Sequence, residues 1–312
     1  MIDRSNRSDR SSNDEVGHVD DLEARLQTAG AGLTSGALGV CVYDYLSDRQ
    51  WTFNGDRWFH AASIMKIAVL AALFDAVERV PRNDGASPHQ PFTLDCRLHV
   101  RNRFLSIVDG SPFRVDRGRD GDADVYAAIG RTMRLRELAA HMIVRSSNLA
   151  TNLLLDLLTP AGVMGTMAHL GVDGIHVCRG VEDDRAFEQG ISNRVTPAGV
   201  VALLRAILDG QVASAAGTAD MIVILHAQQF TGTIEPGLPD NVRTVARVAH
   251  KTGEISTVSH DAGIVFLPGR PPYIVAILVE STGEARERLD AGIAASAAVY
   301  ARVAAAGEGV GR

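Results

Sequence analysis

The sequence predicts an α/β (α+β) fold in which strands from both ends of the chain form one sheet around a helical middle. Apolar, β-branched runs occur near the N-terminus and again in the last third, whereas the middle shows helical periodicity and helix caps. We therefore expect a discontinuous α/β domain from 19–66 and 205–312, with an all-helical domain at 67–204. Residues 1–18, rich in Ser, Asp and Arg, are expected to form a disordered tail.

The first ordered elements follow one another closely. Residues 19–29 have helical spacing, and 36–45 (GALGVCVYDY) alternate like a half-buried strand. The aromatic segment 48–59 contains an Asn-Gly turn signal and is predicted to be the next strand with its exit. A helix is expected to begin at Ser63 and to end near Pro81.

The middle of the chain carries helix signals. Residues 133–144 (MRLRELAAHMIV) and 148–158 (NLATNLLLDLL) have amphipathic helical spacing. Thr159-Pro160 and Thr196-Pro197 each have the pattern of an N-cap followed by proline at the first helical position. Residues 101–126 form a long insertion, which either overhangs a site and narrows substrate choice or is an ordinary surface loop.

Three apolar, β-branched runs follow in the last third. They are 244–253 (TVARVAHKTG), 260–268 (HDAGIVFLP) and 273–281 (YIVAILVES), and each is predicted to be a strand. Residues 284–305 have the spacing of an amphipathic helix that closes the chain.

Composition excludes several classes of function. The 312-residue chain is 46% hydrophobic and 22% charged, and its formal net charge is −6. No Lys/Arg-rich run supports nucleic-acid binding, and no apolar run reaches the roughly 20 residues that span a bilayer. Metal-binding and nucleotide-binding motifs are missing, so no cofactor is expected. Oligomeric state is not predicted.

Cysteine usage and the N-terminus suggest a compartment. Cys41, Cys96 and Cys178 are odd in number and lack CxxC spacing, which suits a reducing compartment or buried thiols. The first residues contain no apolar signal-peptide core, so the sequence as it stands favours the cytoplasm. A periplasmic or secreted location is expected if a leader has been removed.

One lysine stands in an otherwise apolar helix. In the run HAASIMKIAVLAALF, Lys66 follows Ser63 by one helical turn. The simpler interpretation is that Ser63 caps the helix while Lys66 extends to the surface. The catalytic interpretation is that burial lowers the pKa of Lys66 until its neutral amine can take the proton of Ser63. Two further stretches favour catalysis: Ser146-x-Asn148 lies between two helices, and Lys251-Thr252-Gly253 lies on a predicted strand.

These three motifs, in this order, resemble the signature set of the serine β-lactamase and penicillin-binding-protein superfamily. The segment SSNLATNLLL is similar to the class A β-lactamase SDN-x-A-x-NLLL helix, including Asn152, and the likeness covers roughly residues 20–306. The resemblance implies a β-lactamase/transpeptidase-like fold, with a five-stranded antiparallel sheet flanked by helices plus an all-helical domain. It also implies a small-molecule substrate, a β-lactam or a related acyl compound.

The resemblance also implies catalytic roles. Ser63 would be the acylated nucleophile, Lys66 its base, and Ser146 the relay of a proton to the departing nitrogen. The backbone N–H groups of Ser63 and Glu254 would form the oxyanion hole.

Substrate binding is assigned in the same way. Asn148 would hold the side-chain amide of the substrate, and Lys251 and Thr252 its carboxylate. Gly253 would let the strand approach the ligand closely.

Two positions depart from the class A pattern. Ser147 stands where class A enzymes carry aspartate, and the resulting Ser-Ser-Asn pattern is typical of penicillin-binding proteins. The expected Ω-loop, at about 179–195, lacks the Arg-x-Glu register that positions the deacylating water. We favour Glu182 for that role, with Glu188 second. We therefore expect β-lactam hydrolysis through acyl-Ser63. The alternatives are a D-Ala-D-Ala peptidase or esterase of the same superfamily, or a penicillin-binding sensor without turnover.

Overall fold

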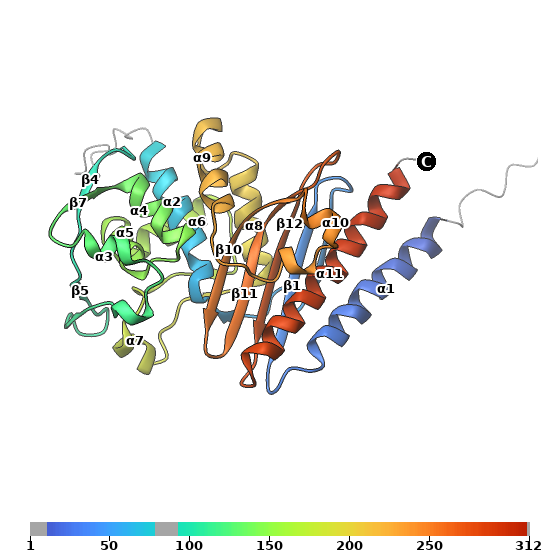
Figure 1. The fold of residues 1–312 in the computed structure, drawn as a ribbon, viewed down its shortest axis with the longest axis horizontal. Helices are drawn as coiled ribbons and strands as arrows, with labels where there is room; N and C mark the ends of the chain where they lie inside the picture. Colours follow the sequence, from blue (N-terminus) through green and yellow to red (C-terminus); the bar gives the residue numbers. More distant parts are fainter. Residues whose placement is uncertain (1–10, 79–92, 311–312) are drawn as a thin grey trace, which may run out of the picture.

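The computed structural model describes residues 11–78 and 93–310 (Figure 1). The first ten residues of the expected tail and the helix end predicted near Pro81 lie outside the described residues. Helix α1 begins at Ser11, inside the segment expected to be a tail and earlier than residue 19. The run of Ser, Asn, Asp and Glu at 11–15 is typical of a helix start as well as of a disordered segment, which is why composition misled us there.

A five-stranded antiparallel sheet forms the centre of the α/β part, as predicted. Its strand order is β10-β11-β12-β1-β2, so a strand pair from the N-terminal region joins a three-stranded meander from the C-terminal region. The strands are β1 Ala37–Asp44, β2 Arg49–Phe53, β10 Arg247–Ile255, β11 Val258–Phe266 and β12 Tyr273–Glu280. The sheet is therefore assembled from both ends of the chain.

Two long helices cover one face of the sheet. Figure 1 shows α1, Ser11–Gly30, lying beside α11, Ala285–Val310. Their apolar side chains, such as Leu26 and Val299, form one core cluster with side chains from the sheet. The stretch 285–306 within α11 is long and apolar enough to cross a membrane by composition alone. Here its apolar side packs onto the sheet, which accounts for that composition.

Helices also cover the opposite face, where they extend into the helical part of the molecule. Helix α8, Pro197–Leu208, packs against β1 and β12 and crosses the domain boundary expected at 204/205. The exact division into domains stays a prediction. Helix α2, Lys66–Glu78, is buried through its first ten residues, which explains why its sequence is apolar on every side.

The helices around α2 share the largest core cluster with it. They are α4 Leu135–Val144, α5 Asn148–Leu158, α6 Pro160–His169 and α9 Ala215–His226. The predicted caps are confirmed: the hydroxyl oxygens of Thr159 and Thr196 accept hydrogen bonds from the N–H groups of Gly162 and Gly199, at 3.1 and 3.0 Å.

Short elements complete the described chain. They are β3 Phe59–His60, η1 Ala62–Met65, β4 Arg97–His99, β5 Phe104–Leu105, β6 Pro112–Phe113, η2 Arg117–Arg119, α3 Ala123–Ala127, β7 Thr132–Arg134, β8 Ile175–His176, α7 Asp184–Glu188, β9 Arg194–Val195, η3 Glu235–Gly237 and α10 Asp240–Arg243.

Candidate active site

Ser63 does not begin an α-helix, contrary to our expectation. It lies in the 3₁₀ turn η1, and the α-helix starts only at Lys66. Side chains three residues apart eclipse one another in a 3₁₀ turn, so Ser63 and Lys66 still share one side. The turn is strained, because Ala62 has a positive φ of 43°.

Two neutral histidines hold this turn. The Nδ1 atom of His60 accepts a hydrogen bond from the Ala62 N–H at 3.0 Å. The His60 carbonyl accepts from Nε2 of His260 at 2.9 Å, and Nδ1 of His260 accepts from the Val279 N–H at 3.0 Å. Burial lowers the pKa of His260 to about 4, so its ring stays neutral at ordinary pH. The backbone beside Ser63 is thus fixed from the sheet.

Lys66 is fully buried, and three oxygen atoms surround its amine. Nζ lies 2.6 Å from the Ser146 carbonyl oxygen, 3.1 Å from Ser146 Oγ and 2.8 Å from Asn148 Oδ1. Burial lowers the pKa of Lys66 to about 7, against the opposing effect of the negative charges of Asp120 and Glu182. A substantial fraction of the amine is therefore neutral near pH 7.

Ser146 lies between the nucleophile and this amine. Its Oγ is 2.9 Å from Ser63 Oγ and 3.1 Å from Lys66 Nζ. Ser146 has a φ of 57°, which turns the chain sharply between α4 and α5. The three side chains thus form a continuous path for a proton. The sequence motifs predict each member of this path, but not that Ser146 would be its middle.

Asn148 connects this path to the Ω-loop. Its Oδ1 accepts from Lys66 at 2.8 Å, while its Nδ2 donates to Glu182 Oε1 at 2.8 Å. The other carboxylate oxygen of Glu182 accepts from the Asp116 N–H at 2.8 Å. Asn152 fixes the preceding residue, since its side-chain amide exchanges hydrogen bonds of 2.7 and 2.8 Å with the backbone of Val181.

The structure separates the two candidate glutamates. Glu182 is buried and has a positive φ of 63°, so its backbone is held in an uncommon conformation. Glu188 is exposed at the end of α7 and lies outside the residues that line the hollows around Ser63. The two residues are separated by the start of α7, where the buried Asp183 caps the helix through its hydrogen bond from the Ala186 N–H.

Strand β10 forms the wall of the site opposite the segments that carry Lys66, Ser146 and Asn148. We call β10 the strand wall and these segments the helical wall. A Cβ atom on Gly253 would lie 3.2 Å from the Ser63 nitrogen, so glycine lets β10 pack closely against the turn that carries Ser63. Close approach to a ligand stays a prediction. Lys251 is fully buried, and its Nζ donates to the Thr252 carbonyl oxygen at 2.8 Å. Burial and the nearby charge of Lys66 hold the pKa of Lys251 well below its usual range. Lys251 thus lies behind the surface that Thr252 and Gly253 expose.

A buried ion pair supports this wall from behind. Nδ1 of His250 lies 2.7 Å from Oδ1 of Asp261, and Oδ2 of Asp261 accepts from the N–H groups of Thr233 and Ile234 at 2.8 and 2.9 Å. Burial opposes protonation of His250, but the Asp261 carboxylate outweighs it and raises the pKa of the ring. The pair ties strand β10 to the segment at 230–234.

The two walls enclose a cleft of about 550 Å³. It is lined by residues from both walls and from the segments that close its ends: Ser63, Arg119, Gly121, Ser146, Asn148, Phe230, Thr231, Gly232, Thr233, Thr252, Gly253, Glu254, Ser259, His260, Ala285, Arg286 and Leu289. A second hollow of about 560 Å³ shares Ser63 and Asn148 with the cleft and reaches Glu182. Ser63 therefore lies where the two hollows meet.

Sequence reasoning missed the residues that the insertion contributes. Arg119 lines both hollows, and its Nη1 lies 3.6 Å from an Asp184 oxygen and 4.0 Å from a Glu182 oxygen. The insertion thus overhangs the site, which was one of the two interpretations of 101–126. The sequence feature that could have directed attention to this segment is its four aspartates between residues 116 and 124.

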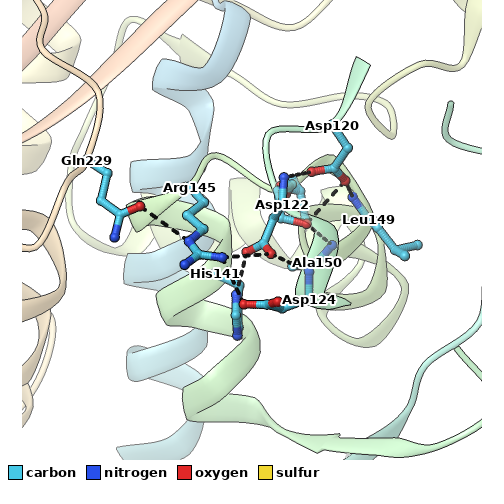
Figure 2. A network of polar contacts seen from close by, with 10 residues as sticks. Asp120, Asp122, Asp124, His141, Arg145, Leu149, Ala150 and Gln229 are labelled. Atoms are coloured by element: carbon cyan, nitrogen blue, oxygen red, sulfur yellow. Dashed lines mark hydrogen bonds and ion pairs between the residues drawn. The ribbon is translucent and has the colours of Figure 1, made fainter. Parts of the chain in front are cut away.

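Part of the insertion forms a charged network beside the site (Figure 2). Asp122, Asp124 and His141 bring ligand-type atoms within 4.8 Å of one another. The Arg145 guanidinium lies 2.8 Å from an Asp124 oxygen and 3.7 Å from an Asp122 oxygen. The arginine thus neutralises the cluster from within the protein.

One class of serine hydrolases has a Ser-x-x-Lys centre. In this class a buried lysine is connected by hydrogen bonds to an accessible serine, as Lys66 is to Ser63 here. The family model described as "Beta-lactamase enzyme family" matches residues 21–303. The chain belongs to that family, and this membership supports binding of a small-molecule substrate.

Individual relatives agree with this assignment. A β-lactamase of Streptomyces albus G is 26% identical over 289 residues, covering 91% of this chain and 85% of the relative. The crystal structure of a β-lactamase from Sphaerobacter thermophilus superposes with a TM-score of 0.71 at 26% identity, covering 91% of this chain and 97% of the other. A PBP-A mutant in an acyl-enzyme complex with penicillin G shares the fold, with a TM-score of 0.72 at 24% identity and coverage of 90% and 96%.

Proposed function

We propose that this protein hydrolyses β-lactams through an ester formed on Ser63. One observation carries the proposal: a continuous set of hydrogen bonds runs from Ser63 through Ser146 to Lys66, and from there through Asn148 to Glu182. Such a set connects the group that removes the proton of the nucleophile to a carboxylate suited to activate water.

Acylation uses the first part of this set. The neutral amine of Lys66 has two N–H donors and one lone pair. Its three contacts fit this form if it donates to the Ser146 carbonyl and to Asn148 Oδ1 and accepts from the Ser146 hydroxyl. As Ser63 Oγ attacks the lactam carbonyl, its proton passes to Ser146 Oγ, and the proton of Ser146 passes to Lys66.

Collapse of the tetrahedral intermediate reverses the proton path. The C–N bond of the ring breaks, the nitrogen takes a proton from Ser146, and Ser146 recovers one from the Lys66 ammonium. The backbone N–H groups of Ser63 and Glu254 stabilise the oxyanion in this proposal, and each such donor typically contributes on the order of 10²–10³ in rate. Lys66 ends this half-reaction neutral.

Deacylation uses the second part. Glu182 takes a proton from a water molecule, which attacks the Ser63 ester, and the proton then returns to Ser63 Oγ as the ring-opened acid leaves. Glu182 is suited to this role because Asn148 and the Asp116 N–H fix both of its oxygens beside the hollow that contains Ser63. A sensor that stays acylated would not need a carboxylate in this position.

Substrate orientation is assigned to the strand wall. Thr252 lines the cleft, and its hydroxyl can donate to a substrate carboxylate, while Lys251 supplies positive charge from behind it. Asn148 would meet the side-chain amide of the substrate from the opposite wall.

The test is to mix the purified protein with a chromogenic cephalosporin and to follow intact mass in parallel. Steady turnover with little adduct is expected. A stable one-to-one adduct without turnover would instead favour the sensor, and turnover of D-Ala-D-Ala peptides or simple esters alone would favour the other hydrolases. Ser63→Ala should abolish the adduct while circular dichroism stays unchanged. An adduct that persists in this variant would contradict the assignment of the nucleophile.

A further inference from the structure

The start of helix α5 is held by a carboxylate that its own motif does not contain. Ser147 caps this helix, and its buried Oγ accepts from the Ala150 N–H at 3.1 Å. The Leu149 N–H, another donor of the first turn without a partner inside the helix, donates to Oδ2 of Asp120 at 2.8 Å (Figure 2). The Ser147 hydroxyl lies 3.2 Å from the same oxygen. Asp120 therefore completes the cap from another part of the chain.

Asp120 is itself fixed in place. Its Oδ1 accepts from the Asp122 N–H at 3.0 Å, and Asp122 in turn accepts from the Asp124 N–H at 2.8 Å and pairs with His141 of α4 (Figure 2). Asp120 thus joins the insertion to the start of α5, and the neighbouring Asp122 joins it to α4. A negative charge at a helix N-terminus is also favoured by the helix dipole.

This cap adjoins the two residues that contact Lys66. Ser146 precedes the cap residue and has a φ of 57°, a conformation that serine keeps only when its surroundings fix it. Asn148 follows the cap residue and is the first residue of α5. A shift of the first turn of α5 would move both side chains away from the amine.

We propose that Asp120 is a positioning residue of the active site, which supplies from the insertion the carboxylate that the Ser-Ser-Asn motif lacks and so holds Ser146 and Asn148 against Lys66. The proposal rests on the proposed β-lactamase function. It gives the insertion a part in the reaction, in addition to the overhang that Arg119 forms.

Asp120 also acts on Lys66 through its charge. Burial lowers the pKa of Lys66, whereas the carboxylates of Asp120 and Glu182 raise it; Lys251 faces the same region from β10. Removing the charge of Asp120 lowers the pKa of Lys66 further. In the proposed mechanism the neutral amine is the base, so the acylation rate falls as acid protonates it; we call this falling part of the pH profile the acid limb. The acid limb should then move to lower pH.

Four variants separate these contributions. Asp120→Ala removes both the hydrogen bonds and the charge, and we expect acylation of Ser63 to slow by about 10–100-fold, the range expected for hydrogen bonds to a charged group. Asp120→Asn keeps an acceptor for the Leu149 N–H, so acylation should stay within a few-fold of wild type while its acid limb moves down in pH. Ser147→Asp added to Asp120→Ala should restore most of the rate, because it returns a carboxylate to the helix start. Asp124→Asn, in the same network but paired with Arg145, is the control and should change little.

Hydrogen exchange gives a readout that is independent of substrate. Peptides covering 145–153 should exchange faster in Asp120→Ala and should regain protection in the double variant. If wild type reacts with no β-lactam, the proposed function fails, and this exchange pattern still decides whether Asp120 holds α5. Asp120 is not a positioning residue if Asp120→Ala acylates and exchanges as wild type does, or if the double variant recovers neither property. Should Asp120→Ala not fold, recovery of a folded and acylating protein on adding Ser147→Asp supports the proposal, and failure of the double variant to recover overturns it.

Discussion

The two walls of the cleft are built in different ways. On the helical wall, side chains bond to one another: Lys66 contacts Ser146 and Asn148, and Asn148 contacts Glu182. On the strand wall, the corresponding lysine bonds to backbone, since Nζ of Lys251 donates to the Thr252 carbonyl. A proton can move along the first arrangement, whereas the second provides shape and charge. The difference supports the proposal that the helical wall carries the chemistry and the strand wall orients the substrate.

The two buried lysines, one in each wall, differ in the charges around them. Both are fully buried and both have a lowered pKa. Lys66 has two carboxylates nearby, which oppose the effect of burial, and its pKa is about 7. For Lys251, the charge of Lys66 adds to the effect of burial, and the Asp261 carboxylate opposes both. A carboxylate arriving in the cleft would raise the pKa of Lys251 and favour its charged form, so substrate binding and the protonation of this lysine should support one another.

The largest effect should come from the helical wall. Lys66→Ala removes the base and one end of the path through Ser146, so acylation should fall by about 10³–10⁴, within the range typical of general base catalysis. Stopped-flow acylation with a chromogenic cephalosporin measures this rate. An acylation rate near that of wild type would remove Lys66 from the mechanism and make the two walls equivalent.

Deacylation should depend on one glutamate of the two. Glu182→Gln should slow hydrolysis of the ester by about 10²–10³ and leave acylation nearly intact, so that an adduct on Ser63 accumulates in intact mass spectra. Glu188→Gln is a matched control, because its carboxylate is exposed at the end of α7. Accumulation of the adduct in Glu188→Gln alone would reverse our assignment.

The strand wall should affect binding more than chemistry. Thr252→Val keeps the size and branching of the side chain and removes the donor for a substrate carboxylate, which should raise KM by about tenfold with a smaller change in kcat. Steady-state kinetics with penicillin G measure both parameters. If kcat falls as much as kcat/KM while KM stays constant, this wall takes part in the chemical step and the contrast between the walls is wrong.

The pH dependence of acylation should report on the same lysine of the helical wall. The pKa of Lys66 is about 7, and in the proposed mechanism its neutral form is the base. Acylation should therefore be constant above pH 8 and should fall by roughly tenfold per pH unit well below pH 7. Single-turnover acylation rates from pH 5 to 9 test this, with circular dichroism at each pH as the control for folding. A flat profile across pH 7 would mean that a group other than Lys66 takes the proton.

Much of the fold and site followed from the sequence, because short-range patterns determine them. The β-branched runs predicted β10, β11 and β12. The run 36–45 predicted β1, but not its burial: we expected a half-buried strand, whereas seven of its eight residues are buried because helices cover both faces of the sheet. The Thr-Pro caps predicted the starts of α6 and α8. The spacing of Ser63 and Lys66 predicted a shared side, which the 3₁₀ turn preserves although we expected an α-helix.

What the sequence could not decide depends on contacts between distant segments. Whether Glu182 or Glu188 enters the site depends on how Asn152, thirty residues before Glu182, fixes the backbone of Val181. Asp120 reaches the start of α5 only because the insertion folds back over α4. The sequence alone thus determined the residues able to do the chemistry, because their types and local spacing are properties of short segments. The tertiary structure decided which of them meet, because hydrogen bonds between segments far apart in the chain leave no periodic pattern along it.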